Sequence, residues 1–179
     1  FDDADVIEGQ ASVAVEMLEQ LGRMPDMVVL PVGGGGLASG VRRYLAAQGD
    51  TAMRLVEPAG GTSLGAALSA GRPVTLPTVD SFVDGAAVAR IGTQTFAHLA
   101  DVAPGHLLSA PEDRISVTML EMLNIEGIVL EPAGALAIDA LPDLADEIRG
   151  KTVVCVTSGG NFDFERLPEV KERAMRFSG

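Results

Sequence analysis

Four consecutive glycines, Gly33 to Gly36, stand between an apolar run and a stretch that favours a helix. The apolar run, Met27–Val32, has the composition of a buried parallel strand, and residues 37–48 are rich in Leu, Ala and Arg. Where a strand turns into a helix through residues without side chains, several backbone N–H groups gather at the helix N-terminus and can bind a phosphate. The loop, together with the N–H of Leu37, therefore predicts a phosphate-bearing ligand held by the main chain.

Three kinds of phosphate site use glycine-rich loops. A P-loop ends in Gly-Lys-Ser/Thr, whereas this loop is followed by Leu-Ala, which excludes a P-loop. A dinucleotide-binding loop has the pattern G-x-G-x-x-G/A and an acidic residue about 20 positions further on. Gly33, Gly35, Ala38 and Glu57 fit that pattern, so an NAD-binding domain stays open. The third kind is a cup of three or four consecutive N–H donors, as used for pyridoxal phosphate.

A second polar motif follows another apolar run. Residues 152–157 have the composition of a buried strand, and they are followed by Ser158, Gly159, Gly160 and Asn161. Because ligands of open parallel sheets bind beyond the carboxyl ends of the strands, we expect Ser158 on the same rim as the glycine loop. A hydroxyl there can hydrogen-bond a heteroatom of a ring whose phosphate lies in the loop. Dinucleotide binding needs no such serine, so the motif favours pyridoxal phosphate.

Four motifs follow one another along the chain: Val-Gly-Gly-Gly-Gly-Leu at 32–37, Asp-Gly-Ala-Ala-Val at 84–88, Glu-Pro-Ala-Gly-Ala at 131–135 and Ser-Gly-Gly-Asn at 158–161. In this order the chain resembles the second half of the catalytic domain of threonine dehydratases (threonine ammonia-lyases), which are fold-type II pyridoxal-phosphate enzymes. The resemblance covers essentially all 179 residues. It implies conversion of L-threonine to 2-oxobutanoate and ammonia in isoleucine biosynthesis. Serine dehydratases and serine racemases share these motifs and remain alternatives.

The resemblance also implies roles for single residues. It places the pyridine nitrogen of the cofactor at Ser158, the ring edge near Gly85, and the phosphate at Gly33, Gly34, Gly35, Gly36 and Leu37. Glu131 resembles a glutamate at the rim of the ring. It also stands where a helix is expected to begin, and a carboxylate there is stabilised by the helix dipole in any case. Both interpretations of Glu131 stay open.

The chain has no lysine where the family needs one. Enzymes of this kind bind the cofactor through a lysine Schiff base. Only Lys151, before the strand at 152–157, and Lys171, in the last charged helix, are present, and we expect neither at the rim. We therefore expect the lysine and the small domain on a segment N-terminal to this chain. Glu131 is then the one candidate for a catalytic residue here, and the isolated chain is expected to be inactive.

Glu57 is also a weak candidate for a metal ligand. Related serine racemases and dehydratases bind a divalent metal through a glutamate at this position, a carbonyl four residues on and an aspartate six residues on. Those two positions hold Gly61 and Ser63 here, so the third ligand is missing. We expect no divalent metal site, while a monovalent cation stays open.

The composition predicts a globular domain that handles a small molecule. A net charge of −12 excludes most nucleic-acid binders, which need a basic surface. No run approaches the roughly 20 apolar residues of a membrane span, and no signal peptide is evident. Cys155 is the only cysteine, so we expect an inert, buried thiol and a cytoplasmic location. The partners expected are an amino-acid substrate and, in the full-length enzyme, further copies of the same protein.

The chain alternates between strand-like and helix-like segments, which predicts an α/β fold with a mostly parallel open sheet and helices on both faces. The resemblance implies the large-domain part of the tryptophan-synthase-β-like architecture, as one lobe over residues 1–179 without a regulatory domain. Strands are expected over 27–32, 52–56 and 152–157, with a short apolar piece at 106–108. Helices are expected over 6–21, 37–48, 63–70, 93–100, from a Ser109 cap to 124, from 131, and over 165–176.

Overall fold

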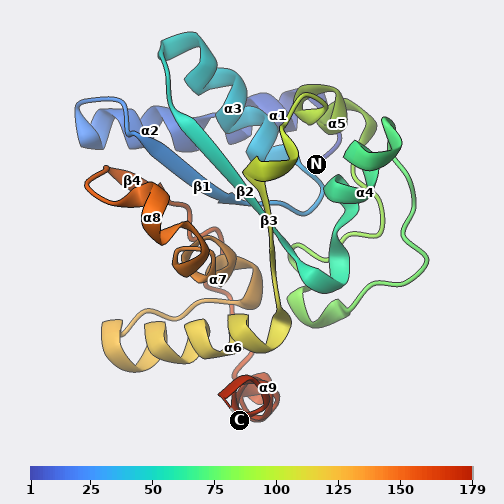
Figure 1. Cartoon of the computed structure of the whole chain (residues 1–179), viewed down its shortest axis with the longest axis vertical. Coiled ribbons are helices and arrows are strands. Elements are labelled where there is room, and N and C mark those ends of the chain that lie inside the picture. Colours follow the sequence, from blue (N-terminus) through green and yellow to red (C-terminus); the bar gives the residue numbers. More distant parts are fainter. Residues whose placement is uncertain (179) are drawn as a thin grey trace.

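The computed structural model describes residues 1–178, which form a four-stranded sheet with helices on both sides (Figure 1). The strands are β1 (Met27–Pro31), β2 (Ala52–Pro58), β3 (Leu107–Ala110) and β4 (Val153–Cys155). The helices are α1 (Ala4–Gln10), α2 (Ser12–Leu21), α3 (Gly36–Gln48), α4 (Ser63–Ala70), α5 (Thr93–Leu99), α6 (Glu112–Glu121), α7 (Pro132–Asp139), α8 (Ala145–Ile148) and α9 (Leu167–Ser178).

The sheet is entirely parallel, with the strand order β3-β2-β1-β4. Met27 at the start of β1 is aligned with Ala52 of β2 on one side and with Val153 of β4 on the other. The carboxyl ends of all four strands therefore lie at the same end of the sheet, where the loops after β1 and β4 meet. This arrangement confirms the predicted fold class.

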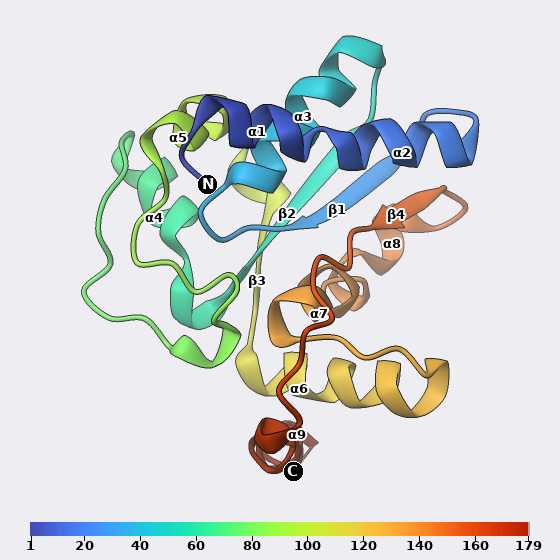
Figure 2. The same cartoon turned by 180° about the vertical axis from the view of Figure 1, so that it is seen from behind.

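Side chains of β1 alternate between two apolar cores. Met27 and Val29 pack with α6 and α7, while Val28 and Leu30 pack with α2, α3 and α5. In Figures 1 and 2 the N-terminal helices α1 to α3 lie on one side of the sheet and α6 to α8 on the other. Burial on both faces explains why β1 is a continuous apolar run and not an alternating one.

Helix α1 lies so close to α3 that only glycine fits at one contact. A Cβ atom on Gly40 would collide with the backbone oxygen of Ile7 and would lie 2.8 Å from the backbone nitrogen of Ala11. This contact brings the first residues of the chain to the start of α3, beside the glycine loop.

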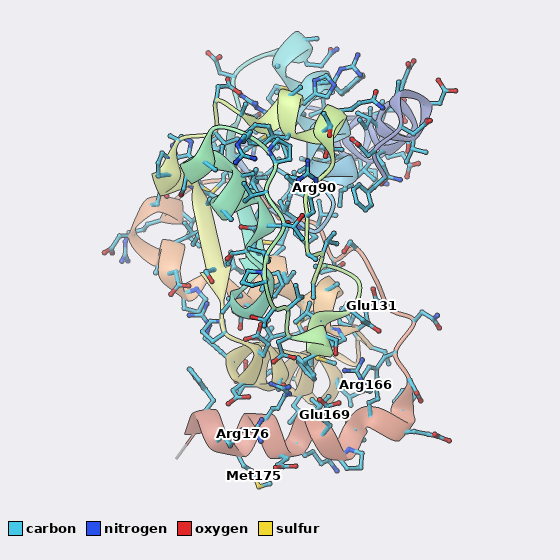
Figure 3. The ribbon with its side chains drawn as sticks, turned by 90° about the vertical axis from the view of Figure 1, so that its right-hand side faces the viewer. Arg90, Glu131, Arg166, Glu169, Met175 and Arg176 are labelled. Atoms are coloured by element: carbon cyan, nitrogen blue, oxygen red, sulfur yellow. The ribbon has the colours of Figure 1, made fainter. Side chains whose placement is uncertain are left out.

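The last helix, α9, packs against α6 and forms the lower edge of the molecule in Figure 3. Arg173 reaches Asp113 at 3.4 Å, and its guanidinium lies 4.2 Å from the ring centroid of Phe82. Arg176, labelled in Figure 3, pairs with the same Asp113 at 3.1 Å. Among the helices of residues 1–178, none combines the length and the apolar character that a membrane span requires.

Several predicted boundaries were wrong. The helix expected over 6–21 is two helices that meet at Ala11, and the strand expected over 152–157 is shortened to β4. Ser109 does not cap a helix: it lies in β3, and α6 begins after Pro111 without a side-chain cap. A π-helical turn at Met122–Glu126 follows α6. The apolar piece expected at 106–108 forms β3, which begins one residue later and ends two residues later than expected.

Candidate cofactor site

The glycine loop presents unpaired backbone N–H groups at the start of α3. Within residues 1–178, the amides from Gly33 to Leu37 donate to no protein acceptor, and the first bond of the helix runs from the Ser39 amide to the Gly35 oxygen. Gly35 has φ of +91°, a left-handed conformation that other residues rarely adopt. The loop is thus a set of donors without acceptors, as an anion site requires.

The glycines of this loop are explained by close contacts with neighbouring residues as well as by the left-handed backbone conformation. A Cβ atom on Gly33 would lie 2.9 Å from the Ala86 Cα, and one on Gly34 would overlap the ring of Phe1. The loop is therefore confined between the segment around Ala86 and the first residue of the chain.

These amides open into a cavity of about 380 Å³, which is within the range of small-molecule sites. Every residue to which the sequence assigned a cofactor contact lines this cavity: Gly33, Gly34, Gly35, Gly36, Leu37, Gly85 and Ser158, together with Glu131. Ser158 is exposed, and its hydroxyl has no hydrogen-bond partner within residues 1–178. The fold therefore brings together four motifs that lie up to 125 residues apart, from Gly33 to Ser158.

The carboxylate of Glu131 faces the cavity instead of capping α7. Glu131 occupies the cap position of α7, yet its side chain accepts no hydrogen bond from the helix amides. A Cβ atom on Gly85 would lie 3.1 Å from its Oε1, and one on Gly159 would collide with the same atom. Partial burial, with a smaller contribution from the charge of Asp84, raises the pKa of Glu131. Figure 3 shows Glu131 midway between the N-terminal helices and α9.

Glu57 is enclosed away from this cavity. Its side chain is buried, and its two oxygens accept hydrogen bonds from the amides of Leu64, at 2.6 Å, and Gly65, at 3.0 Å. Desolvation raises the pKa of Glu57 to about 7, although both hydrogen bonds act to lower it. A carboxylate enclosed in this way cannot reach the ribose of a dinucleotide, which argues against the NAD-binding interpretation.

The residues around Glu57 were also considered as a cation site in the sequence analysis. The hydroxyl of Ser63 is buried without a hydrogen-bond partner within residues 1–178. Over the same residues, no group of three or more His, Cys, Asp or Glu side chains is arranged to hold a metal ion. Whether a cation binds beside Glu57 stays a prediction.

Neither lysine lines the cofactor cavity. Lys151 is exposed and precedes β4, at the end of the strand opposite to Ser158. Lys171 lies on α9 and lines a separate groove against α6 with Val117 and Met175. Desolvation raises the pKa of the partly buried Cys155 thiol to about 11, which fits an unreactive cysteine.

Sequence reasoning missed the residues that support the loop from behind. Asp2 accepts hydrogen bonds from the amides of Thr93, Gln94 and Thr95 at the start of α5, at 2.7–3.1 Å. The Thr95 hydroxyl in turn donates to the Gly34 oxygen at 2.7 Å. No local pattern could have indicated these contacts, because Asp2 and Thr95 lie 93 residues apart in the chain.

Comparison with known proteins shows the family of the chain. A protein-family model described as pyridoxal-phosphate dependent enzyme matches residues 1–159. The chain is 48% identical over 180 residues to a biosynthetic L-threonine dehydratase of Bacillus subtilis, covering 100% of this chain and 42% of that protein. It is 51% identical over 179 residues to the enzyme of the same name from Mycobacterium tuberculosis, covering 98% of this chain and 41% of that protein. The chain thus spans about two fifths of the length of these relatives.

Solved structures show the same fold. The processed form of threonine deaminase isoform 2 from Solanum lycopersicum superposes with a TM-score of 0.89 at 34% identity, covering 97% of this chain and 51% of that one. A serine racemase from Dictyostelium discoideum gives a TM-score of 0.79 at 28% identity, covering 91% of this chain and 52% of that one. With its amide-lined cavity and a family match over residues 1–159, the chain belongs to the pyridoxal-phosphate-dependent enzymes.

Proposed function

We propose that this chain is the cofactor-holding part of a threonine dehydratase, which converts L-threonine to 2-oxobutanoate and ammonia. The observation that carries the proposal is the row of unpaired amides from Gly33 to Leu37, which shares one cavity with the free hydroxyl of Ser158. Curated relatives at 48% and 51% identity carry the name biosynthetic L-threonine dehydratase, which supports the choice of substrate.

In this proposal the glycine loop binds the phosphate of the cofactor. Neutral amides at a helix N-terminus attract an anion without a basic side chain. They thereby offset the repulsion expected from a chain of net charge −12. Among residues 1–178, no lysine or arginine lines the cavity, so the phosphate would be bound there without a cationic side chain from these residues.

The hydroxyl of Ser158 is assigned to the ring nitrogen. A neutral hydroxyl can donate to an unprotonated nitrogen, whereas an aspartate at this place would favour the protonated form. Gly85 and Glu131 would border the ring from the other side of the cavity. When bound, pyridoxal phosphate withdraws electrons from the α-carbon of an amino acid, which eases removal of its proton.

The group that removes that proton is not assigned to this chain. Lys151 and Lys171 lie away from the cavity, and Glu131 is the one titratable side chain that lines it within residues 1–178. We therefore place the Schiff-base lysine on a part of the protein outside these 179 residues. Glu131 lines the cavity, and partial burial raises its pKa.

The proposal is tested by measuring cofactor binding and L-threonine turnover in the full-length protein. The protein is first stripped of cofactor and then titrated with pyridoxal phosphate or NAD. We expect pyridoxal phosphate to bind, NAD not to bind, and L-threonine to yield 2-oxobutanoate once the cofactor is restored. L-Serine and D-serine serve as competing substrates, and a preference for either would favour the serine dehydratase or serine racemase alternative. Binding of NAD in place of pyridoxal phosphate would contradict the proposal.

The variant Ser158→Ala gives a sharper test of the ring contact. Loss of one hydrogen bond should weaken cofactor binding by about three- to tenfold. The melting temperature of the cofactor-free protein should not change, because the Ser158 hydroxyl has no hydrogen-bond partner within residues 1–178. Ser12→Ala, at an exposed serine that does not line the cavity, is the matched control. Equal affinities for wild type and Ser158→Ala would remove Ser158 from the site.

A further inference from the structure

The glycine loop needs an external constraint if its amides are to face the ligand. Glycine adopts positive and negative φ with similar ease, so peptide planes in a run of four glycines can turn over at little cost. If the Gly34–Gly35 peptide turned over, the Gly34 oxygen would replace the Gly35 N–H in the cavity. An oxygen facing a phosphate would repel it. The orientation of this one peptide therefore decides whether the loop attracts or repels an anion.

The structure holds this peptide from the side opposite the cavity. Thr95 Oγ1 donates to the Gly34 oxygen at 2.7 Å, and the Gly92 amide lies 3.4 Å from the same oxygen. Thr95 is completely buried and does not line the cavity, whereas Gly34 and Gly35 do. Because C=O and N–H point in opposite directions across a trans peptide, fixing the Gly34 oxygen toward Thr95 directs the Gly35 N–H into the cavity.

Thr95 is itself fixed at each of its polar groups. Its amide donates to Asp2 Oδ1 at 3.1 Å, and its carbonyl accepts from the Ser39 hydroxyl at 3.2 Å. Its Cβ also closes the space beside Gly35, since a Cβ atom on Gly35 would lie 2.9 Å from it. The backbone of Thr95 is thus held between α3 and Asp2, and its hydroxyl donates to the Gly34 oxygen.

We infer that Thr95 is a positioning residue for phosphate binding, acting through the Gly34–Gly35 peptide, with Asp2 holding Thr95 in place. The inference rests on the proposed function, because it takes the cofactor phosphate as the ligand of the loop. Thr95 touches neither the phosphate nor the substrate. Its removal should therefore weaken binding of any ligand that carries the phosphate and leave binding of the rest of the cofactor unchanged.

The test compares the affinities of the full-length, cofactor-free protein for pyridoxal phosphate, inorganic phosphate and pyridoxal. Thr95→Val removes the hydroxyl and keeps the shape of the side chain. We expect it to weaken pyridoxal phosphate and inorganic phosphate by about tenfold and pyridoxal by less than about twofold. The ³¹P resonance of bound pyridoxal phosphate should also move. Thr95→Ser, which keeps the hydroxyl, should restore both readouts.

Thr93→Val is the matched control, because Thr93 stands on the same helix, is exposed, and uses only its backbone amide in the network. Asp2→Asn is the second variant should Thr95→Val fail to fold, and it should weaken the two phosphate ligands selectively. A folded Thr95→Val protein with wild-type affinity for both phosphate ligands would overturn the inference. Wild-type protein that binds pyridoxal as tightly as pyridoxal phosphate would instead overturn the phosphate cup of the proposed function, and the inference with it.

Discussion

At the scale of single residues, the polar groups that line the candidate cofactor cavity within residues 1–178 include main-chain amides, one side-chain hydroxyl, one carboxylate and the carboxamide of Gln10. Gly33 to Leu37 provide the amides, Ser158 the hydroxyl and Glu131 the carboxylate. Amides do not titrate, so the loop offers the same donors at every physiological pH. Any pH dependence of phosphate binding should then come from the phosphate, from Glu131 and from the constraints behind the loop.

Glu57 gives a prediction about stability against pH. Its pKa is raised from 4.5 to about 7 on folding, so between these values the folded protein holds a proton that the unfolded chain has lost. The Glu57 contribution to the free energy of unfolding is therefore greatest below about pH 4.5 and declines as pH rises to about 7. Glu57→Gln cannot ionise and should lack this decline.

The measurement is urea unfolding of wild type and Glu57→Gln at pH 5, 6, 7 and 8. The wild-type free energy of unfolding minus that of the variant should fall by about 2 kcal/mol across this series. Taking the difference removes the contributions of the other titrating groups. Parallel curves for the two proteins would show that Glu57 is ionised in the folded state throughout this range.

At the scale of elements, the close contact of α1 with α3 positions both Phe1 and Asp2 at the glycine loop. Gly40→Ala should force these helices apart, because the new methyl group would meet the backbone of Ile7 and Ala11. We expect a loss of about 1–3 kcal/mol in the free energy of unfolding, as for other overpacked contacts. Gly9→Ala, in α1 with no atom near the added methyl group, should instead stabilise by about 0.5–1 kcal/mol.

Thermal and urea unfolding of Gly40→Ala and Gly9→Ala, each compared with wild type, measure these changes in the free energy of unfolding. Cofactor affinity should fall in Gly40→Ala and stay unchanged in Gly9→Ala, because only the first substitution moves α1 relative to the loop. Equal stability of the two variants would mean that α1 can shift without cost.

The elements that the sequence predicted well are those with a local signal. The apolar run before the glycines forms β1, and residues 63–70 form α4 as expected. The break at Ala11 was missed because residues on both sides of it favour a helix. Ser109 was taken for a cap because serine often caps helices, yet pairing of β3 with β2 places it in a strand.

The residues of the candidate site also differ in whether a local sequence pattern indicates them. The glycine loop and Ser158 follow apolar runs, so their place at the carboxyl ends of strands could be deduced from local pattern. The orientation of the Glu131 side chain could not be deduced, because capping and facing the cavity are both compatible with a helix start. The contact of Thr95 with Gly34 joins residues 61 positions apart and depends on how α5 packs against α3. Only the folded structure provides that information.

At the scale of the whole molecule, the negative net charge of the chain opposes binding of pyridoxal phosphate. The chain carries a net charge of −12, and the cofactor phosphate is also an anion. Salt screens this repulsion over about 10 Å at 0.1 M ionic strength. Raising sodium chloride from about 20 to about 200 mM should therefore strengthen binding of pyridoxal phosphate by about two- to fivefold.

Isothermal titration at the two salt concentrations measures this effect. Tetramethylammonium chloride is the control, because it screens charge in the same way without the small cation that a site beside Glu57 could hold. Weaker binding in both salts would contradict this expectation, because it would mean that salt screens a net attraction of the phosphate and not a net repulsion.

The pairing of β1 with β4 has a consequence for how the protein is made. Met27 is aligned with Val153, and the Asp26 amide donates to the Thr152 oxygen, so the two strands join segments 126 residues apart. At a synthesis rate of about 5–20 residues per second, β1 leaves the ribosome roughly 6–25 s before its neighbour on that side. During this interval the nascent strand has at least one open edge, because β2 can pair with only one side of it, and it adjoins apolar surface that is not yet covered. Ribosome-associated chaperones are therefore expected to act on the chain until residue 155 has emerged.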